Sequence, residues 1–205
     1  MHHNWLNTAQ HIQSIAQAGL TYCENDYDRE RYQELLQISA HILADYTDTS
    51  FEKITDLFER EKGYLTPKVD IRGVIFQEDK LLMVQEKSDG CWTVPGGWAD
   101  VGYSPSEIAV KEVQEEAGID VVPERLLAVL DKKCHAHPPT PYYTYKIFIL
   151  CRYVSGTVAP GAETQGAGFF ALSELPSLSE ERLTKSQAEL LFNLYLHPEN
   201  APVFD

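Results

Sequence analysis

The chain is poor in basic residues and has no long apolar run. Lysine and arginine number 17 among 205 residues, against 31 aspartates and glutamates, and the formal net charge is −14. This balance opposes a broad grip on nucleic-acid phosphates or on an anionic membrane surface. No stretch approaches the ~18 uninterrupted apolar residues of a membrane span, and the first residues lack the pattern of a secretory signal. We therefore expect neither a membrane protein nor a nucleic-acid-binding protein.

Cysteines and common catalytic motifs are also few. Cys23, Cys91, Cys134 and Cys151 are scattered, with no Cys-x-x-Cys pair, which favours free thiols and a cytoplasmic location. The run CHAH at 134–137 lacks a second ligand pair for zinc and precedes two prolines, so we expect a loop there. Neither GxSxG nor a P-loop occurs, which argues against serine hydrolases and the usual nucleotide triphosphatases.

Helical periodicity dominates the first part of the chain. Apolar residues recur at helical spacing up to Gly19, a natural helix stop, and again over about 28–46. Thr49 and Glu52 have the spacing of a capping box for a third helix. We expect residues 1–66 to form a small helical domain whose apolar faces need a partner. The helices can cover one another, cover the rest of the chain or pair with a second copy, and we favour a homodimer.

From residue 67 onward the pattern changes to strands. β-prone segments bounded by turn residues predict strands at 69–76, 81–84, 91–94, 126–131, 143–153 and 169–172. Thr184 and Gln187 are spaced to cap a terminal helix. Strands interleaved with helices predict a layered α/β domain over residues 67–205.

The segment Pro95–Ile119 carries the strongest local signal. It reads PGGWADVGYSPSEIAVKEVQEEAGI. Ser104 suits the N-cap of a helix, Pro105 suits the first helical position, and Glu107 completes a capping box with Ser104. Gly118 is the natural stop. The sequence therefore predicts a helix between Ser104 and Gly118.

One side of this predicted helix concentrates carboxylates. At 100° per residue, Glu112, Glu115 and Glu116 fall within an arc of about 100°, and apolar residues cover the opposite side. Three like charges so close repel one another unless a cation neutralises them, and Mg²⁺ is typically held by one or two carboxylates plus substrate phosphates. A solvated acidic face is the alternative. The glycines in front favour a ligand, because they let the backbone approach it closely.

The spacing of this segment resembles the Nudix box: a glycine, five residues, a glutamate, seven residues, then Arg-Glu-apolar-x-Glu-Glu-x-Gly-apolar. The residues that match are Gly97, Glu112, Val113, Glu115, Glu116, Gly118 and Ile119. Two positions differ, because Tyr103 replaces the first glutamate and Lys111 replaces the arginine. In the family these two positions brace the loop against the helix. We expect a replacement brace between the Tyr103 hydroxyl and the Lys111 ammonium.

The resemblance implies a Nudix α/β/α sandwich with a mixed sheet, preceded by the helical domain. It also implies a pyrophosphohydrolase, dependent on magnesium or manganese (Mg²⁺ or Mn²⁺), that splits a nucleoside diphosphate-X into a nucleoside monophosphate and phospho-X. The whole chain resembles bacterial CDP-choline and ADP-ribose pyrophosphatases, and we favour CDP-choline slightly over ADP-ribose. The alternative from another class is a nucleotide-binding sensor of Nudix fold with weak or no catalysis. The intact glutamates argue against the sensor, and the altered pair argues mildly for it.

The resemblance assigns roles to the acidic residues. Glu112 and Glu116 are the expected metal ligands, and the carbonyl of Gly96 is the expected backbone ligand. Glu115 is a further ligand, or alternatively an ion-pair partner of the lysine four residues before it. These three glutamates form the expected catalytic set together with Glu163, a candidate general base outside the box. The alternative for Glu163 is a solvated loop carboxylate.

Substrate-binding candidates lie outside the acidic helix. Arg72 and Lys87 can meet phosphate oxygens, with solvent-facing strand charges as the alternative. Trp98, inside the glycine loop, can stack on a base or hold a quaternary ammonium by cation–π attraction. Its alternative is to fill an edge of the core.

Overall fold

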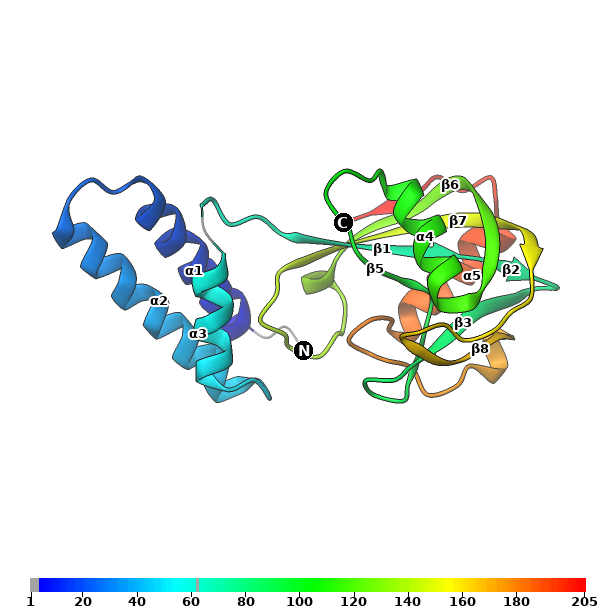
Figure 1. The fold of residues 1–205 in the computed structure, drawn as a ribbon, viewed down its shortest axis with the longest axis horizontal. Helices are drawn as coiled ribbons and strands as arrows, with labels where there is room; N and C mark the ends of the chain where they lie inside the picture. Colours follow the sequence, from blue (N-terminus) through cyan, green and yellow to red (C-terminus); the bar gives the residue numbers. More distant parts are fainter. Residues whose placement is uncertain (1–3, 62) are drawn as a thin grey trace. The chain divides into compact units, whose positions relative to one another are not determined.

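The computed structural model describes residues 4–61 and 63–205, which form two compact units (Figure 1). The first unit comprises the chain up to Pro67 together with Pro138–Tyr143. The second comprises Lys68–His137 and Thr144–Asp205. The glycine-rich and acidic segment identified from the sequence lies wholly within the second unit.

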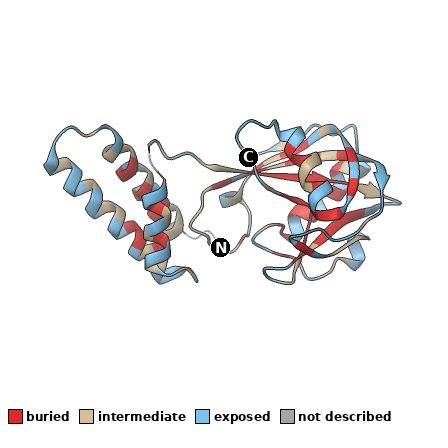
Figure 2. Cartoon of the chain, in the orientation of Figure 1, coloured by how far each residue is buried: buried red, intermediate tan, exposed pale blue. Residues whose placement is uncertain are grey.

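The helical unit contains α1 (Asn4–Tyr22), α2 (Asp26–Tyr46) and α3 (Phe51–Arg60). Its core is made of apolar side chains from all of these helices, and Figure 2 colours buried positions on each helix red. They include Ala9, Ala40, Leu43, Ile54 and Phe58. The helical N-terminal region expected from the periodicity is therefore confirmed.

Two local expectations for the helical unit were wrong. Gly19 lies within α1 and does not end it. The Tyr32 ring of α2 packs so closely on this position that a Cβ on Gly19 would lie 2.4 Å from it. The N-cap of α3 is Ser50, whose Oγ accepts from the backbone N–H of Lys53 at 3.3 Å. The glycine therefore serves helix packing, and the capping box expected at Thr49 is not used.

The second unit contains the sheet strands and two further helices. The strands are β1 (Lys68–Val74), β2 (Phe76–Gln77), β3 (Lys80–Glu86), β4 (Trp92–Thr93), β5 (Gly96–Trp98), β6 (Ile119–Asp131), β7 (Thr144–Gly156), β8 (Thr164–Phe170) and β9 (Val203–Phe204). The helices are α4 (Pro105–Ala117) and α5 (Lys185–Leu196), and the short 3₁₀ turns are η1 (Lys132–Cys134) and η2 (Leu172–Glu174). Two strands, β6 and β8, begin earlier than the sequence predicted.

One sheet is mixed, as expected, and the other is antiparallel. One has the order β5-β1-β7-β6-β9, in which β1 runs parallel to β7 and antiparallel to β5. In the other, β3 pairs with β2, β4 and β8. Strand β8 begins at Thr164, before the strand expected at 169–172, and its glycines leave room for neighbouring side chains: a Cβ on Gly166 would lie 3.0 Å from Trp92.

Successive side chains along β1 contact different helix layers. Ile71 and Ile75 belong to the buried cluster that contains the apolar side of α4, whereas Val74 belongs to the cluster that contains α5. Successive side chains of a strand point to opposite faces, so the two clusters lie on opposite sides of the sheet. This confirms the α/β/α arrangement. It also means that Asp70 and Arg72, at even positions, face away from α4.

Candidate active site

Helix α4 forms as its end signals predict. The Ser104 hydroxyl accepts from the backbone N–H of Glu107, and the Glu107 carboxylate accepts from the N–H of Ser104 at 2.8 Å. Gly118 ends the helix in the left-handed region, with φ of 70°. On the packed side, a Cβ on Gly73 would lie 2.5 Å from a Val113 methyl, so the helix lies directly on β1. The acidic side of α4 is thereby fixed against the sheet edge.

The three carboxylates on this side of α4 differ in solvent exposure. Glu116 is 6% exposed, and its Oε2 accepts from the backbone N–H of Gly96 at 2.9 Å. The Glu112 side chain is 14% exposed, and its carboxylate lies beside Gly97, where an added Cβ would be 3.3 Å from it. Glu115 is 57% exposed. Glu112 and Glu116 therefore face the glycine strand, and Glu115 stands at the solvent edge.

The backbone conformation and close packing of strand β5 require glycine at its first position. Gly96 has φ of 147°, and a Cβ there would lie 2.1 Å from the carbonyl oxygen of Ile71. Because β5 stands at the edge of the sheet, next to β1, alternate backbone groups point away from the sheet. The Gly96 N–H points outward in this way, toward Glu116.

The surroundings of these carboxylates disfavour their charge. Burial raises the pKa of Glu116 from 4.5 to about 7; the Gly96 N–H and Arg72 oppose this, and Glu86 and Glu112 add to it. Burial also raises the pKa of Glu112, against Lys111, and the charges of Glu115 and Glu163 raise it further. Glu112 therefore feels the charge of Glu163, the out-of-box candidate.

A divalent cation fits this arrangement. The buried Glu116 and the partly buried Glu112 both have raised pKa values and gain from a nearby positive charge, and the missing side chain of Gly97 leaves room beside Glu112. Across residues 4–61 and 63–205, no three acidic, histidine or cysteine side chains converge as a complete ligand set. Mg²⁺ usually keeps several waters and takes substrate phosphates as ligands, so two carboxylates are sufficient protein ligands.

The raised pKa of Glu116 predicts a pH-dependent stability of the metal-free protein. Because the folded pKa of about 7 exceeds the ordinary 4.5, the contribution of this group is fully present below pH 4.5 and is lost as pH rises through 7. The loss in unfolding free energy is up to roughly 3 kcal/mol. Urea titrations at pH 4.5 to 8 should show it in wild type and much less of it in Glu116→Gln. Parallel curves for the two proteins would contradict the prediction.

The loop between β7 and β8 is fastened to the end of α4. The backbone N–H of Gly161 and the hydroxyl of Thr164 both donate to the carbonyl of Glu116, at 3.3 and 2.8 Å, and the N–H of Ala159 donates to the carbonyl of Ala117 at 3.0 Å. These bonds satisfy carbonyls that a helix end leaves open. The exposed Glu163 carboxylate belongs to this loop and is thus held beside the acidic helix.

A substitution at Gly161 tests whether the position of this loop matters for turnover. A Cβ there would lie 1.6 Å from the carbonyl oxygen of Glu115, so Gly161→Ala must displace the loop. We expect turnover to fall about 100-fold, as for a ~1 Å misplacement of a reacting group. Gly168→Ala is the matched control, because its Cβ would meet nothing closer than 3.6 Å. Equal turnover of the two variants in a hydrolysis assay would contradict this account of the loop.

The expected brace between Tyr103 and Lys111 was wrong. The Lys111 ammonium bonds the carboxylate of Asp100, three residues before Tyr103, at 3.2 Å. It also lies 3.6 Å from a carboxylate oxygen of Glu115 and 3.7 Å from one of Glu112. An ammonium binds a charged carboxylate more strongly than a neutral phenol, and Asp100 provides a carboxylate in this loop. Tyr103 is exposed.

The other substrate-binding candidates occupy different environments. Lys87 is exposed, and its ammonium donates to the carbonyl of Ala162 while its backbone N–H donates to that of Glu163 at 3.3 Å. It therefore holds the loop in the structure. Trp98 is 49% exposed at the end of β5, opposite Asp70 of β1, so it does not fill a core edge.

Arg72 is buried, so the alternative of a solvent-facing charge was wrong. It is 5% exposed; its Nε donates to Asp70 Oδ1 at 2.8 Å and its Nη1 donates to the carbonyl of Val94 at 3.1 Å. Burial opposes its charge, but Asp70, then Glu116 and Glu86, hold its pKa above the ordinary value.

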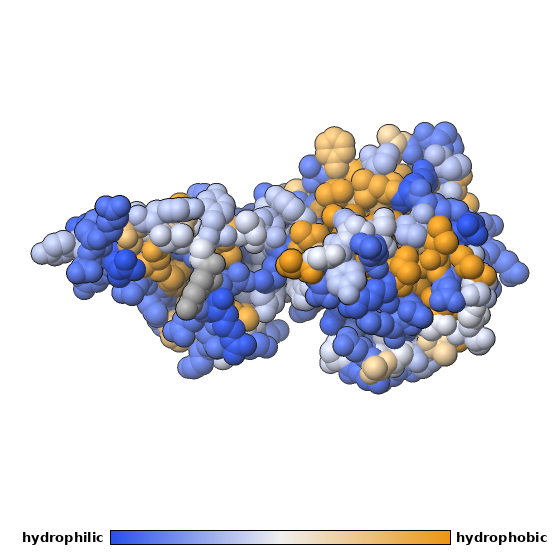
Figure 3. All heavy atoms as spheres, turned by 45° about the horizontal axis from the view of Figure 1, so that its top comes forward, coloured by the Kyte–Doolittle hydropathy of each residue, from blue (hydrophilic) through white to orange (hydrophobic). Residues whose placement is uncertain are grey.

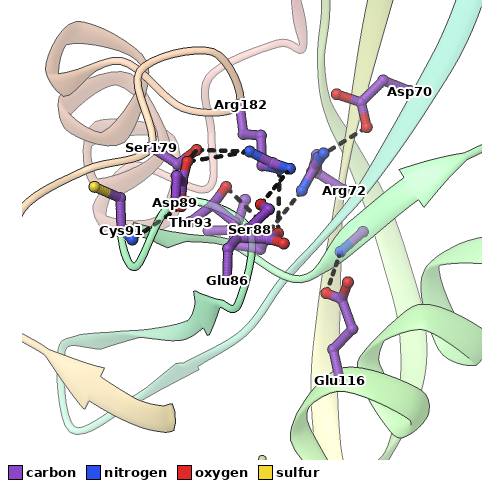
Figure 4. Close-up of polar contacts among 12 residues, drawn as sticks. Asp70, Arg72, Glu86, Ser88, Asp89, Cys91, Thr93, Glu116, Ser179 and Arg182 are labelled. Carbon is purple, nitrogen blue, oxygen red and sulfur yellow. Dashed lines mark hydrogen bonds and ion pairs between the residues drawn. The ribbon is translucent and has the colours of Figure 1, made fainter. Parts of the chain in front are cut away.

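Sequence reasoning missed the charged residues around Arg72. They are Asp70, Glu86, Lys146 and Arg182 (Figure 4 shows all but Lys146). Arg182 bonds Glu86 through Nε at 3.2 Å and Asp89 through Nη1 at 3.2 Å. The available signal was a charge inside an apolar strand, as in KVDIRGV and TYKIFIL, which is typical of a buried pair.

Comparison with known families decides the affiliation. The model of the NUDIX domain matches residues 66–194. The chain belongs to the Nudix family. A second model, described as a UDP-X-like, N-terminal oligomerisation domain, matches residues 3–58. The resemblance read from the spacing of the box, including the helical segment before it, is confirmed.

Relatives cover nearly the whole Nudix chain. It is 51% identical over 201 residues to a Bacillus subtilis (strain 168) protein named "Putative ADP-ribose pyrophosphatase YjhB", covering 98% of this chain and 97% of that one. A crystal structure of an ADP-ribose pyrophosphatase from Streptococcus suis is 45% identical, with a TM-score of 0.63, and covers 68% of this chain and 100% of that chain. A crystal structure of a UDP-X diphosphatase is 32% identical, with a TM-score of 0.65, and covers 98% of each chain.

Two general statements follow for this member of the Nudix hydrolases. Enzymes of the family generally use divalent metal ions, in agreement with the carboxylates facing Gly96 and Gly97. None of the helices that the structure describes combines the length and apolar character needed to cross a membrane.

Proposed function

We propose that this Nudix hydrolase is a metal-dependent pyrophosphohydrolase of nucleoside diphosphate-X compounds, with ADP-ribose as the leading substrate. The observation that carries the proposal is the pair of carboxylates facing the glycines of β5, of which Glu116 is buried and Glu112 is partly buried, with Glu163 held at the same place. The names of the similar ADP-ribose pyrophosphatases support ADP-ribose over CDP-choline, which whole-chain likeness alone had favoured.

Glu112 and Glu116 would hold the metal, joined by the Gly96 carbonyl. In a strand the N–H and C=O of one residue point to the same edge, and the Gly96 N–H points at Glu116. Glu115, more exposed and 3.6 Å from Lys111, would act as an outer ligand through water. Mg²⁺ or Mn²⁺ bound there would neutralise the diphosphate and lower the pKa of a water molecule.

The remaining residues would move the proton and hold the substrate. Glu163 would accept a proton from the attacking water, which adds to one phosphorus while the bridging P–O bond breaks and its oxygen leaves with the other phosphate. The Arg72 guanidinium would pair with a diphosphate oxygen beside Glu116. Trp98, half exposed at the end of β5, would stack on the base. Lys87 would act on the substrate indirectly, through its bonds to the Glu163 loop.

The test is a product assay with a small substrate panel. Purified protein is incubated with ADP-ribose, CDP-choline, UDP-glucose and diadenosine polyphosphates, with Mg²⁺, with Mn²⁺ or with chelator. We expect metal-dependent release of AMP and ribose 5-phosphate from ADP-ribose, faster than release of CMP from CDP-choline. Faster CDP-choline cleavage would correct the substrate only. No cleavage of any compound, combined with tight nucleotide binding in calorimetry, would support the function of a nucleotide-binding sensor and refute that of an enzyme.

We also propose that the helical unit mediates a homodimer. It matches the oligomerisation-domain model and exposes several large apolar residues, and Figure 3 shows apolar residues reaching its surface among polar ones. The exposed residues include Ile15, Tyr22, Tyr27, Ile38 and Tyr46. Light scattering should give twice the chain mass of 23.2 kDa, and a monomer at micromolar concentration would refute the proposal.

A further inference from the structure

Strand register brings three buried charges together beside the candidate site. Asp70 and Arg72 lie two positions apart on β1, so their side chains share a face. Parallel pairing places Lys146 of β7 opposite Asp70, and antiparallel pairing places Gly96 of β5 opposite Arg72. The three charged side chains therefore form a row that begins at Lys146 and ends next to the glycine strand.

The side chains of this row contact one another in sequence, from Lys146 through Asp70 to Arg72. The Lys146 ammonium bonds Asp70 Oδ2, and the other oxygen of the same carboxylate accepts from Arg72 Nε at 2.8 Å. Lys146 is 1% exposed, and Asp70 and Arg72 are buried as well. The two cations hold the pKa of Asp70 below its ordinary value in spite of burial. The carboxylate is thus fixed by Lys146 on one side and orients Arg72 on the other.

Arg72 keeps donors available beyond this row. A guanidinium has five N–H donors, and two of those of Arg72 are directed to Asp70 and to the carbonyl of Val94. Its charge is felt by Glu116 and by Glu112, and in Figure 4 its guanidinium lies between Asp70 and the pair formed by Glu86 and Arg182. The end of the side chain that Asp70 does not hold therefore lies toward Glu86 and Arg182, near enough to the site for its charge to act on Glu116 and Glu112.

We infer that Asp70 and Lys146 are positioning residues, which hold the Arg72 guanidinium where a substrate diphosphate would meet it. The inference rests on the function proposed above. A long side chain such as arginine loses much conformational freedom when it binds phosphate, and a partner that fixes Nε beforehand removes that cost from the binding step. Lys146 does not reach the substrate; it acts by holding Asp70.

The alternative is that the buried row stabilises the fold without acting through Arg72. Breaking a buried ion pair destabilises a protein whatever its role, so a stability measurement does not separate the two accounts. Nonadditivity does separate them. A residue that acts only through Arg72 has no effect on substrate once the guanidinium is gone, whereas independent effects multiply.

The experiment is a double-mutant cycle on wild type, Asp70→Asn, Arg72→Gln and the double variant. For each protein we would measure kcat and KM with the best substrate of the panel, and the calorimetric Kd for ADP-ribose without metal. Asp70→Asn should lower kcat/KM about 10- to 100-fold, as expected for a lost outer partner, Arg72→Gln should lower it at least as much, and both should weaken ADP-ribose binding. The double variant should be no worse than Arg72→Gln in either measurement. Losses that multiply would overturn the inference.

Two further variants keep the test decisive. Should Asp70→Asn not fold, the variant with both Asp70→Asn and Lys146→Met takes its place in the cycle, because removing both partners changes no net charge and strands no ammonium. Arg152→Met is the matched control on the same strand, since Arg152 makes an exposed pair with Glu124 at 2.9 Å, and its kinetics should match wild type within about twofold. An inactive wild type overturns the proposed function together with the inference. An active wild type with multiplying losses overturns the inference alone.

Discussion

Glu112→Gln and Glu116→Gln are each expected to abolish metal-dependent turnover while the protein stays folded. The Glu116 carboxylate is buried against Gly96 and the Glu112 carboxylate lies beside Gly97, and glutamine keeps their shape but removes the charge that a divalent cation needs. Loss of a mere outer-shell partner costs about 10- to 100-fold, so loss of a direct ligand should cost roughly 1,000-fold or more in kcat. Steady-state hydrolysis with saturating Mg²⁺ measures the effect.

Stability and metal binding complete this test. Circular dichroism should show both variants folded, and Glu116→Gln should be at least as stable as wild type at pH 8, because the wild-type carboxylate is then charged in a buried place. Calorimetric titration should show weakened Mn²⁺ binding in both. Glu124→Gln, an exposed glutamate on β6, is the control for a lost charge. Wild-type turnover in both variants would end the assignment of the metal ligands.

Glu163→Gln is expected to lower kcat by 100- to 10,000-fold, about the contribution of a positioned general base. The side chain is exposed on the loop that Gly161 and Thr164 fasten to the end of α4, and its charge acts on Glu112. Since it is not expected to bind the metal directly, Mn²⁺ affinity should change less than about threefold, and the falling kcat should carry the whole effect.

The pattern of kinetic change identifies the role of Glu163. A general base predicts a fall in kcat with KM nearly constant, and loss of the limb of the pH–rate profile that reports base ionisation. Weakened Mn²⁺ binding in parallel with kcat would make Glu163 a metal ligand. Kinetics equal to wild type would exclude it from the reaction. Glu174→Gln, a second glutamate outside the box, serves as the control and should leave both constants unchanged.

The parts of the site that depend on local chemistry were predictable from the sequence. The capping box of Ser104 and Glu107, the stop at Gly118 and the inward turn of the apolar side of α4 all depend on residues within one or two helical turns. The resemblance to the box likewise assigned Glu112, Glu116 and the Gly96 carbonyl to one metal site, but the strand β5 that contains Gly96 was not predicted.

The parts that depend on register between distant segments were not predictable. Arg72 was predicted to meet phosphate oxygens, with a solvent-facing charge as the alternative. Its buried ion pair was missed, because nothing in KVDIRGV shows that Lys146, 76 residues after Asp70, would lie beside that carboxylate. The brace of Lys111 was assigned to the wrong residue, because loop conformation decides whether Asp100 or Tyr103 reaches the ammonium. Side-chain spacing within a helix is fixed by geometry, whereas pairing of strands and loops depends on the whole fold.

Anomalous diffraction from crystals soaked in manganese tests the central claim most directly. The account predicts a Mn²⁺ peak within about 2.0 to 2.3 Å of carboxylate oxygens of Glu112 and Glu116 and of the Gly96 carbonyl, with a further ligand from AMP when the nucleotide is added. An empty position, with the Glu116 carboxylate still bonded to the Gly96 N–H and Glu112 still beside Lys111, would contradict it.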